Sequence, residues 1–220
     1  MSNLSDHRLY GILDVSYVDV LAAPAVVRRM IRGGVDLIQL RGKHYTPGRL
    51  AELALQLHEI TSLAQVPLIV NDHAEVARSV RLEGVHVGQD DLPVADVRRI
   101  VARPLIVGKS THNLAQAIAA AEEGADYIGF GPLFATPTKP DYVPIGLNDI
   151  GKVHKAVQIP VFCIGGIKLD NLEAVVAAGA QRVVIVSGLL QSENIEAYAK
   201  AAKQMLLGSS SSISNRRLKI

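Results

Sequence analysis

The amino-acid sequence predicts an α/β fold of the (β/α)8 TIM-barrel type, formed as a single domain. Short apolar runs alternate with amphipathic stretches from near the N-terminus to about residue 206. The runs are rich in Val, Ile and Leu and apolar on both faces, as strands of a parallel sheet between helices must be. Eight such units in 220 residues fit one closed barrel. No Gly-x-Gly-x-x-Gly follows the first run, which weakens the alternative of an open dinucleotide-binding sheet.

Eight apolar runs are expected to form the strands, and amphipathic stretches between them the helices. The strands are predicted at 9–15, 37–40, 67–70, 84–87, 105–107, 127–134, 160–164 and 182–186. The helices are predicted near 22–33, 47–64, 73–81, 93–102, 113–123, 146–157, 170–178 and 193–206. Gly34, Gly124 and Gly179 stand where helices end before the next strand. Asn113 and Asp170 stand at expected N-cap positions.

The domain prediction is a catalytic barrel over residues 1–208 and a flexible Ser-rich C-terminal tail over 209–220. The formal net charge is +2, and removing the tail cations Arg216, Arg217 and Lys219 leaves −1. A near-neutral body predicts no nucleic-acid surface. The single cysteine, Cys163, lies in an apolar run and is expected in the core.

No apolar stretch is long enough to cross a bilayer, and the N-terminus lacks the pattern of a signal peptide. We therefore expect a cytoplasmic protein without a membrane partner. A homo-oligomer is possible, but the sequence leaves the oligomeric state open.

Polar residues gather after the predicted strands, whereas the opposite strand ends carry mostly Gly, Ala and Pro. In a barrel of this type, the C-terminal ends of the strands form the active-site face. Gln39, Arg41 and Lys43 are spaced by two, so all three can point to one side. This asymmetry predicts a catalyst or a ligand-binding barrel.

A polyanion site is predicted at this face. Arg suits bidentate contact with phosphate, and hydroxyl and ammonium groups can add donors. The expected donors are Arg41, Lys43, Ser110, Thr136, Thr138 and Lys139. The alternatives are solvated loop charges and, at residues 136–140, a stiff surface loop with two prolines.

Asp72 and Asp91 would repel a polyanion unless a metal ion lay between them. Mg²⁺ is commonly held by one or two carboxylates together with substrate phosphates. We therefore predict Mg²⁺ on Asp72 and Asp91, while helix capping remains the alternative for each. Asp90 is assigned to capping or simple exposure.

A second anion position is predicted after the last two strands, at Gly165–Gly166 and Ser187–Gly188. The alternative is that these glycines only turn the chain. His86 is expected to be a packed core residue, and His73 and His112 receive no role.

Taken together, these motifs resemble those of the thiamine-phosphate synthase family over nearly the whole chain except its tail. The matching stretches are Gln-Leu-Arg-Gly-Lys (39–43), Val-Asn-Asp (70–72), Gly-Val-His-Val-Gly-Gln-Asp-Asp-Leu-Pro (84–93), Gly-Lys-Ser-Thr-His (108–112), Gly-Ala-Asp-Tyr-Ile-Gly-Phe-Gly-Pro (124–132), Thr-Pro-Thr-Lys (136–139) and Ile-Gly-Gly-Ile (164–167). The resemblance implies an alkyl-transferring enzyme that condenses 4-amino-5-hydroxymethyl-2-methylpyrimidine diphosphate with a thiazole phosphate. Thiamine phosphate and pyrophosphate would be the products.

The resemblance also implies residue roles. Gln39 would contact the pyrimidine, and Asp72 and Asp91 would hold Mg²⁺. The diphosphate would be held by Arg41, Lys43, Asn71, Ser110 and Lys139. The thiazole phosphate would be held by Thr136, Thr138, Gly166, Val186 and Ser187. Arg41, Lys43, Ser110 and Lys139 would be the catalytic contacts.

Two positions depart from the family pattern. Gly42 stands where an acidic residue is expected, and Leu13 where a threonine is expected. These departures bear on fine specificity more than on reaction class. Two other functions remain open: a thiazole tautomerase of the same barrel type, and a non-catalytic phosphometabolite-binding barrel.

Overall fold

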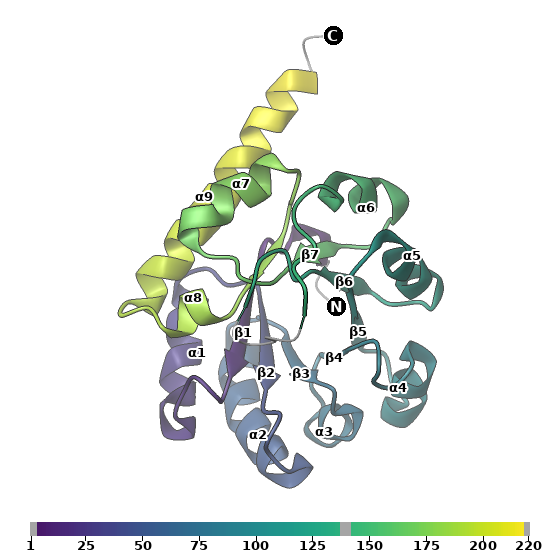
Figure 1. Ribbon diagram of the computed structural model, residues 1–220. Helices are drawn as coiled ribbons and strands as arrows, with labels where there is room; N and C mark the ends of the chain where they lie inside the picture. Colours follow the sequence, from purple (N-terminus) through teal and green to yellow (C-terminus); the bar gives the residue numbers. More distant parts are fainter. Residues whose placement is uncertain (1–3, 137–141, 218–220) are drawn as a thin grey trace.

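The computed structural model describes residues 4–136 and 142–217, with side chains described as far as Gly208. Eight parallel strands close into one barrel in sequence order, from β1 to β8, and β8 pairs with β1. The helices surround the barrel on its outside (Figure 1). The predicted (β/α)8 barrel is therefore confirmed.

The strands are short, and every strand residue but two is buried, the exceptions being Asn71 and Ser110. Their bounds are β1 (Leu9–Asp14), β2 (Leu37–Arg41), β3 (Leu68–Asn71), β4 (Gly84–Val87), β5 (Ile106–Thr111), β6 (Tyr127–Phe130), β7 (Val161–Cys163) and β8 (Val183–Ile185). β1 and β2 pair in a register that sets Asp14 beside Arg41.

Each predicted helix is present, with additional short helices. The helices are α1 (Ala23–Arg32), α2 (Pro47–Leu63), α3 (Ala74–Val80), α4 (Val94–Val101), α5 (Leu114–Glu122), α6 (Ile150–Ala156), α7 (Leu169–Ala177), α8 (Ser187–Leu190) and α9 (Ile195–Arg217). The 3-10 helices are η1 (Leu4–Asp6) and η2 (Val20–Ala22).

Two strand ends lie four residues from the predicted position, and every other strand end lies within one residue of it. β6 ends at Phe130 instead of residue 134, because Pro132 has no N–H to donate and the next residues leave the ladder. Leu133 N instead donates to the Ile164 carbonyl at 2.9 Å, and Phe134 N to the Gly165 carbonyl at 3.1 Å. β5 continues to Thr111, so Ser110 stands within a strand and not in the loop after it.

Helix ends confirm most of the predicted capping. Asn113 Oδ1 accepts from Gln116 N at 2.9 Å at the start of α5. Gly34, Gly124 and Gly179 have φ values of +89°, +84° and +106°, the left-handed conformation that glycine adopts most easily. The prediction for Asp170 is wrong, because Lys168 is the N-cap of α7 and Asp170 lies in the first turn.

The C-terminal helix differs from the predicted end near residue 206. α9 continues through Arg217 and extends away from the barrel in Figure 1. The predicted domain boundary at 208 thus falls inside this helix. The expected flexibility of residues 209–220 stays a prediction.

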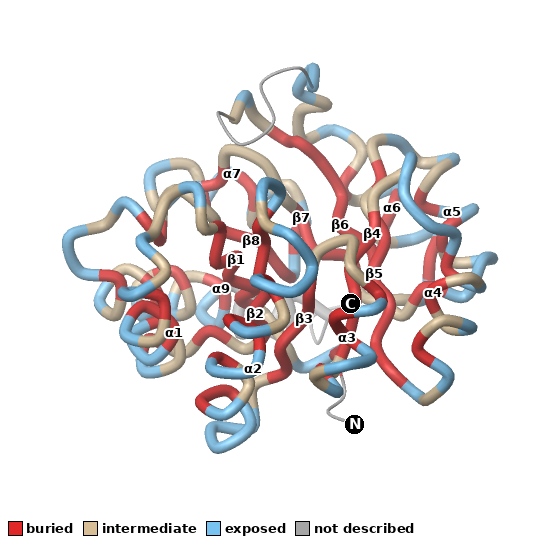
Figure 2. Tube along the Cα trace, turned by 90° about the horizontal axis from the view of Figure 1, so that it is seen from below, coloured by how far each residue is buried: buried red, intermediate tan, exposed pale blue. Residues whose placement is uncertain are grey.

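Apolar side chains form two buried layers. The larger layer lies between strands and helices. Figure 2 shows the strands as mostly buried segments and many of the outer turns as exposed. A smaller cluster fills the barrel, where Tyr10, Tyr127 and Phe162 meet edge to face with ring centroids 5.5–5.9 Å apart. Cys163 is fully buried, and burial raises the pKa of its thiol to about 12, as expected of a core cysteine.

Within the described ranges, no helix combines the length and apolar composition required to span a bilayer.

His154 on α6 is expected to make stability depend on pH. Burial, with a smaller contribution from Arg182, lowers the pKa of His154 to about 4, from 6.5 when unfolded. Between these values the unfolded chain binds more protons, so the free energy of unfolding should fall as pH falls. Between about pH 7 and pH 5, we expect His154 to lower the free energy of unfolding by about 1–2 kcal/mol.

Urea unfolding of the wild type and of His154→Gln at both pH values measures this contribution. The variant should lose less stability on acidification. Equal losses in both proteins would show that folding does not shift the pKa of His154.

Candidate active site

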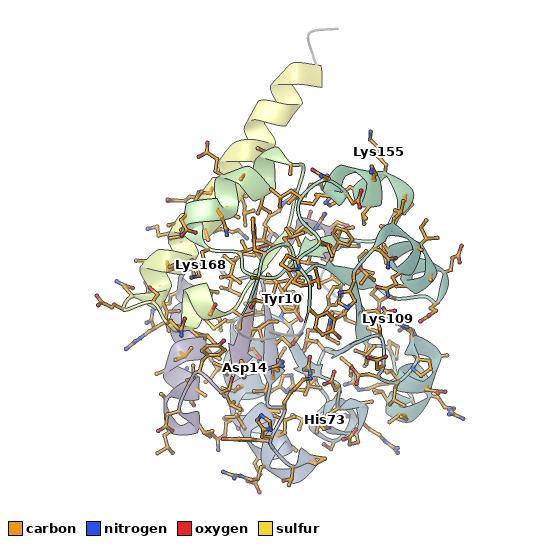
Figure 3. The ribbon with its side chains drawn as sticks, viewed as in Figure 1. Tyr10, Asp14, His73, Lys109, Lys155 and Lys168 are labelled. Carbon is orange, nitrogen blue, oxygen red and sulfur yellow. The ribbon has the colours of Figure 1, made fainter. Side chains whose placement is uncertain are left out.

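One cavity opens at the C-terminal ends of the strands and holds about 910 Å³, its mouth included. Seven strands contribute lining residues, and the segments that follow β5, β6, β7 and β8 supply the rest. The strand residues are Tyr10, Ile12, Gln39, Arg41, Asn71, His86, Ser110, Gly129 and Val184. Figure 3 shows Tyr10 near the centre of the barrel, whereas Lys155 points outward from α6. The cavity therefore lies at the C-terminal ends of the strands, the face on which the sequence predicts the active site.

Most predicted site residues meet at this cavity. Those that line it are Gln39, Arg41, Asn71, Ser110, Thr136, Gly166, Val186 and Ser187. Lys43, Asp72 and Asp91 do not line the cavity; Lys43 and Asp91 are exposed and Asp72 is half-buried. Thr138 and Lys139 lie outside the described residues.

Arg41 is held by a buried carboxylate that sequence reasoning missed. Its Nη1 donates to Asp14 Oδ2 in an ion pair whose side chains are 11% and 2% exposed. Asp14 Oδ1 also accepts from Ser16 N at 2.9 Å and Ser16 Oγ at 2.7 Å. The signal available in the sequence was a carboxylate that closes an otherwise apolar strand. Its pairing with Arg41 follows from the strand register.

Asp72 and Asp91 come together beside the cavity. Burial, followed by the hydrogen bond and the charge of Asp91, raises the pKa of Asp72 to about 6, while the Lys43 charge opposes the shift. Asn71 Nδ2 donates to Asp72 Oδ2, and Asp91 Oδ2 accepts from Gly88 N at 2.7 Å. Two carboxylates this close suit a divalent cation, although no set of three or more His, Cys, Asp or Glu residues forms a metal site within the described ranges.

His86 was expected to be a packed core residue, and it is buried at 8% exposure but also lines the cavity. Its Nε2 lies 2.9 Å from Ser110 Oγ, and its Nδ1 lies 3.0 Å from the Tyr127 hydroxyl. The Ser110 carbonyl accepts from Gln89 Nε2. A histidine inside an apolar strand, one residue before the strand end, was the missed signal.

Close packing requires the two glycines after β7. Gly165 and Gly166 have φ values of +99° and +64°. A Cβ at Gly165 would come within 2.4 Å of Pro132, and one at Gly166 within 2.7 Å of the Ala135 carbonyl oxygen. The turn therefore brings the backbone of Gly166 to the cavity, close to the start of α8 at Ser187.

His112 also lines the cavity, although the sequence assigned it no role. Its Nδ1 donates to the Gly131 carbonyl, and its ring lies 4.9 Å from the Tyr142 ring. The carbonyl can only accept, so this contact fixes a hydrogen on Nδ1.

Known proteins match this chain over its full barrel. Residues 9–189 match the family model described as thiamine monophosphate synthase. A thiamine-phosphate synthase of Chloroflexus aurantiacus is 41% identical over 207 residues, covering 94% of this chain and 95% of the relative. One from Halalkalibacterium halodurans is 40% identical over 211 residues, covering 94% and 100%.

A solved structure agrees with these relatives. Thiamine phosphate pyrophosphorylase from Pyrococcus furiosus superposes with a TM-score of 0.83 at 30% identity, covering 92% of this chain and 96% of its own. Barrel, cavity position and sequence relatives all lead to one conclusion: the chain belongs to the thiamine monophosphate synthase family and is a transferase of thiamine biosynthesis.

Proposed function

We propose that this protein joins 4-amino-5-hydroxymethyl-2-methylpyrimidine diphosphate to 4-methyl-5-(2-phosphoethyl)thiazole or its carboxylated form, releasing pyrophosphate and forming thiamine phosphate. The observation that carries the proposal is that two different anion-binding groups meet at one cavity. Arg41, Asn71 and Ser110 line it together with Gly166 and Ser187. Two phosphorylated substrates would then face each other across a shared space.

The diphosphate is assigned to the side of the cavity formed by β2, β3 and β5. Arg41 offers a planar guanidinium fork, which Asp14 holds in place. Asn71 and Ser110 add uncharged donors, and exposed Lys43 stands beyond the cavity lining. Lys139 is proposed to complete this set. These groups would stabilise the negative charge that grows on the departing pyrophosphate.

Mg²⁺ is proposed to bind at Asp72 and Asp91. The fit rests on the donor set, because Asp91 opposes ionisation of Asp72 and a cation between them removes that conflict. Two carboxylates leave coordination positions for diphosphate oxygens and water. When bound, the metal would neutralise charge on the leaving diphosphate.

The remaining residues would bind and orient the two organic groups. Gln39 and Tyr10 both line the cavity, and they would hold the pyrimidine. The thiazole phosphate is assigned to Thr136, Thr138, Gly166, Val186 and Ser187. The C–O bond of the pyrimidine diphosphate would break first, and the thiazole nitrogen would then attack the methylene cation. Such a step requires positioning and charge stabilisation rather than a strong base.

A pyrophosphate-release assay tests this function. The purified protein, given both phosphorylated substrates, is expected to release pyrophosphate only when Mg²⁺ is present. No release with fresh substrates and metal would contradict the synthase function. Metal-independent isomerisation of the thiazole would instead identify a tautomerase, and ligand binding without turnover a binding barrel.

A further inference from the structure

Five polar side chains from five strands form one hydrogen-bonded chain across the barrel interior. Gln39 Nε2 donates to the Tyr10 hydroxyl at 2.6 Å, and that hydroxyl lies 2.9 Å from the hydroxyl of Tyr127. Tyr127 contacts His86 Nδ1 at 3.0 Å, and His86 Nε2 contacts Ser110 Oγ at 2.9 Å. We call these five residues the relay.

The first half of the relay has a preferred hydrogen order. Burial raises the pKa of Tyr10 and of Tyr127 well above the ordinary value, so each keeps its single hydroxyl hydrogen. The amide nitrogen of Gln39 can only donate, so the Tyr10 oxygen accepts from it. Within the described ranges, the other hydrogen-bond contact of the Tyr10 hydroxyl is with Tyr127, which therefore accepts the Tyr10 hydrogen.

The opposite order is disfavoured. If Tyr127 donated to Tyr10, the hydrogen of Tyr10 would point away from both contacts. Tyr10 is 1% exposed, and leaving such a buried donor without an acceptor costs about 1–3 kcal/mol. A cavity ligand that accepted this hydrogen would remove the cost, which makes the opposite order the rival to test.

The second half of the relay follows from the first. With its oxygen accepting from Tyr10, Tyr127 points its hydrogen toward His86 Nδ1. That nitrogen must then present a lone pair, so a neutral His86 ring carries its hydrogen on Nε2. Nε2–H donates to Ser110 Oγ, and the hydroxyl hydrogen of Ser110 is turned away from His86.

We propose that the relay holds His86 as the Nε2–H tautomer and thereby directs the Ser110 hydroxyl hydrogen into the cavity, toward an anionic oxygen of a ligand. His86 and Tyr127 act here as positioning residues. In the other tautomer, Ser110 would donate to His86 and present lone pairs to the anion. The identity of the anion as a diphosphate rests on the proposed function, whereas the tautomer of His86 does not.

The tautomer can be measured directly on the intact protein. Long-range ¹H–¹⁵N spectra of imidazole-labelled protein at about pH 8, above the ordinary histidine pKa, distinguish protonated from lone-pair nitrogens. His86→Asn identifies the His86 signals by their disappearance. A protonated Nε2 and an unprotonated Nδ1 are expected. A protonated Nδ1 would overturn the proposal in favour of the opposite order.

Binding of inorganic pyrophosphate with Mg²⁺, measured by calorimetry, tests the consequence for Ser110. Ser110→Ala and Tyr127→Phe are each expected to weaken binding about tenfold, and the double variant no further, because both remove one oriented donor. Tyr45→Phe removes the hydroxyl of a tyrosine that is not a member of the relay and whose ring lies under Arg49. It is the matched control and should bind as the wild type does.

These outcomes distinguish failure of the relay proposal from failure of the diphosphate assignment. If the wild type does not bind pyrophosphate, the diphosphate assignment of the proposed function fails, and the spectra still decide the tautomer. If Ser110→Ala weakens binding but Tyr127→Phe does not, the relay does not orient Ser110. Additive losses in the double variant would likewise overturn the proposal.

Discussion

Asp91→Asn is expected to lower the rate of Mg²⁺-dependent pyrophosphate release by about a thousandfold, or about 4 kcal/mol of transition-state stabilisation. The physical reason is loss of one of the two anionic ligands proposed for the cation. Asparagine keeps an oxygen that can accept from Gly88 N, so the loop should keep its conformation. Higher Mg²⁺ concentrations should restore part of the activity, because the other carboxylate remains.

Asp90→Asn is the matched control, because Asp90 is the exposed neighbour with the same charge and side chain. Steady-state rates of both variants across a Mg²⁺ titration make the comparison. We expect Asp90→Asn to stay within about twofold of the wild type, as is usual for surface changes. Unchanged turnover in Asp91→Asn would remove Asp91 from the metal site, and equal losses in both variants would point to the loop instead.

Asp14→Ala is expected to reduce the free energy of unfolding by about 3–5 kcal/mol. The substitution leaves the guanidinium of Arg41 buried without its partner, and it also removes the acceptor of two Ser16 hydrogen bonds. Turnover should fall as well, since an unpaired Arg41 loses the contact that fixes its orientation. Urea unfolding and steady-state kinetics measure the two effects.

The double variant Asp14→Ala with Arg41→Met separates stability from catalysis. Replacing a buried ion pair by apolar groups is often neutral for stability, so much of the lost stability should return. Activity should not return, because the proposed diphosphate contact is gone. If the double variant is no more stable than Asp14→Ala, the unpaired charge is not the cause of the instability.

The sequence determined the barrel itself. The alternation of β-branched apolar runs with amphipathic stretches places eight strands and the helices between them, and each predicted element is present. Strand ends were less predictable. β6 stops at Phe130 because its continuation bonds to Ile164 and Gly165 on a distant loop, which no local pattern reveals. β5 runs to Thr111, although its last residues are polar, because the neighbouring strand β6 pairs with them.

The sequence also determined which strand ends carry chemistry. Gln39, Arg41, Asn71 and Ser110 could be predicted because polar residues at the ends of apolar strands stand out. Only the tertiary structure decided how these groups are held. The contacts of Asp14 with Arg41, and of His86 with Ser110 and Tyr127, join residues 24 to 41 positions apart in the sequence. Barrel closure and strand register create such pairs, and a hydrophobic pattern along the chain contains neither.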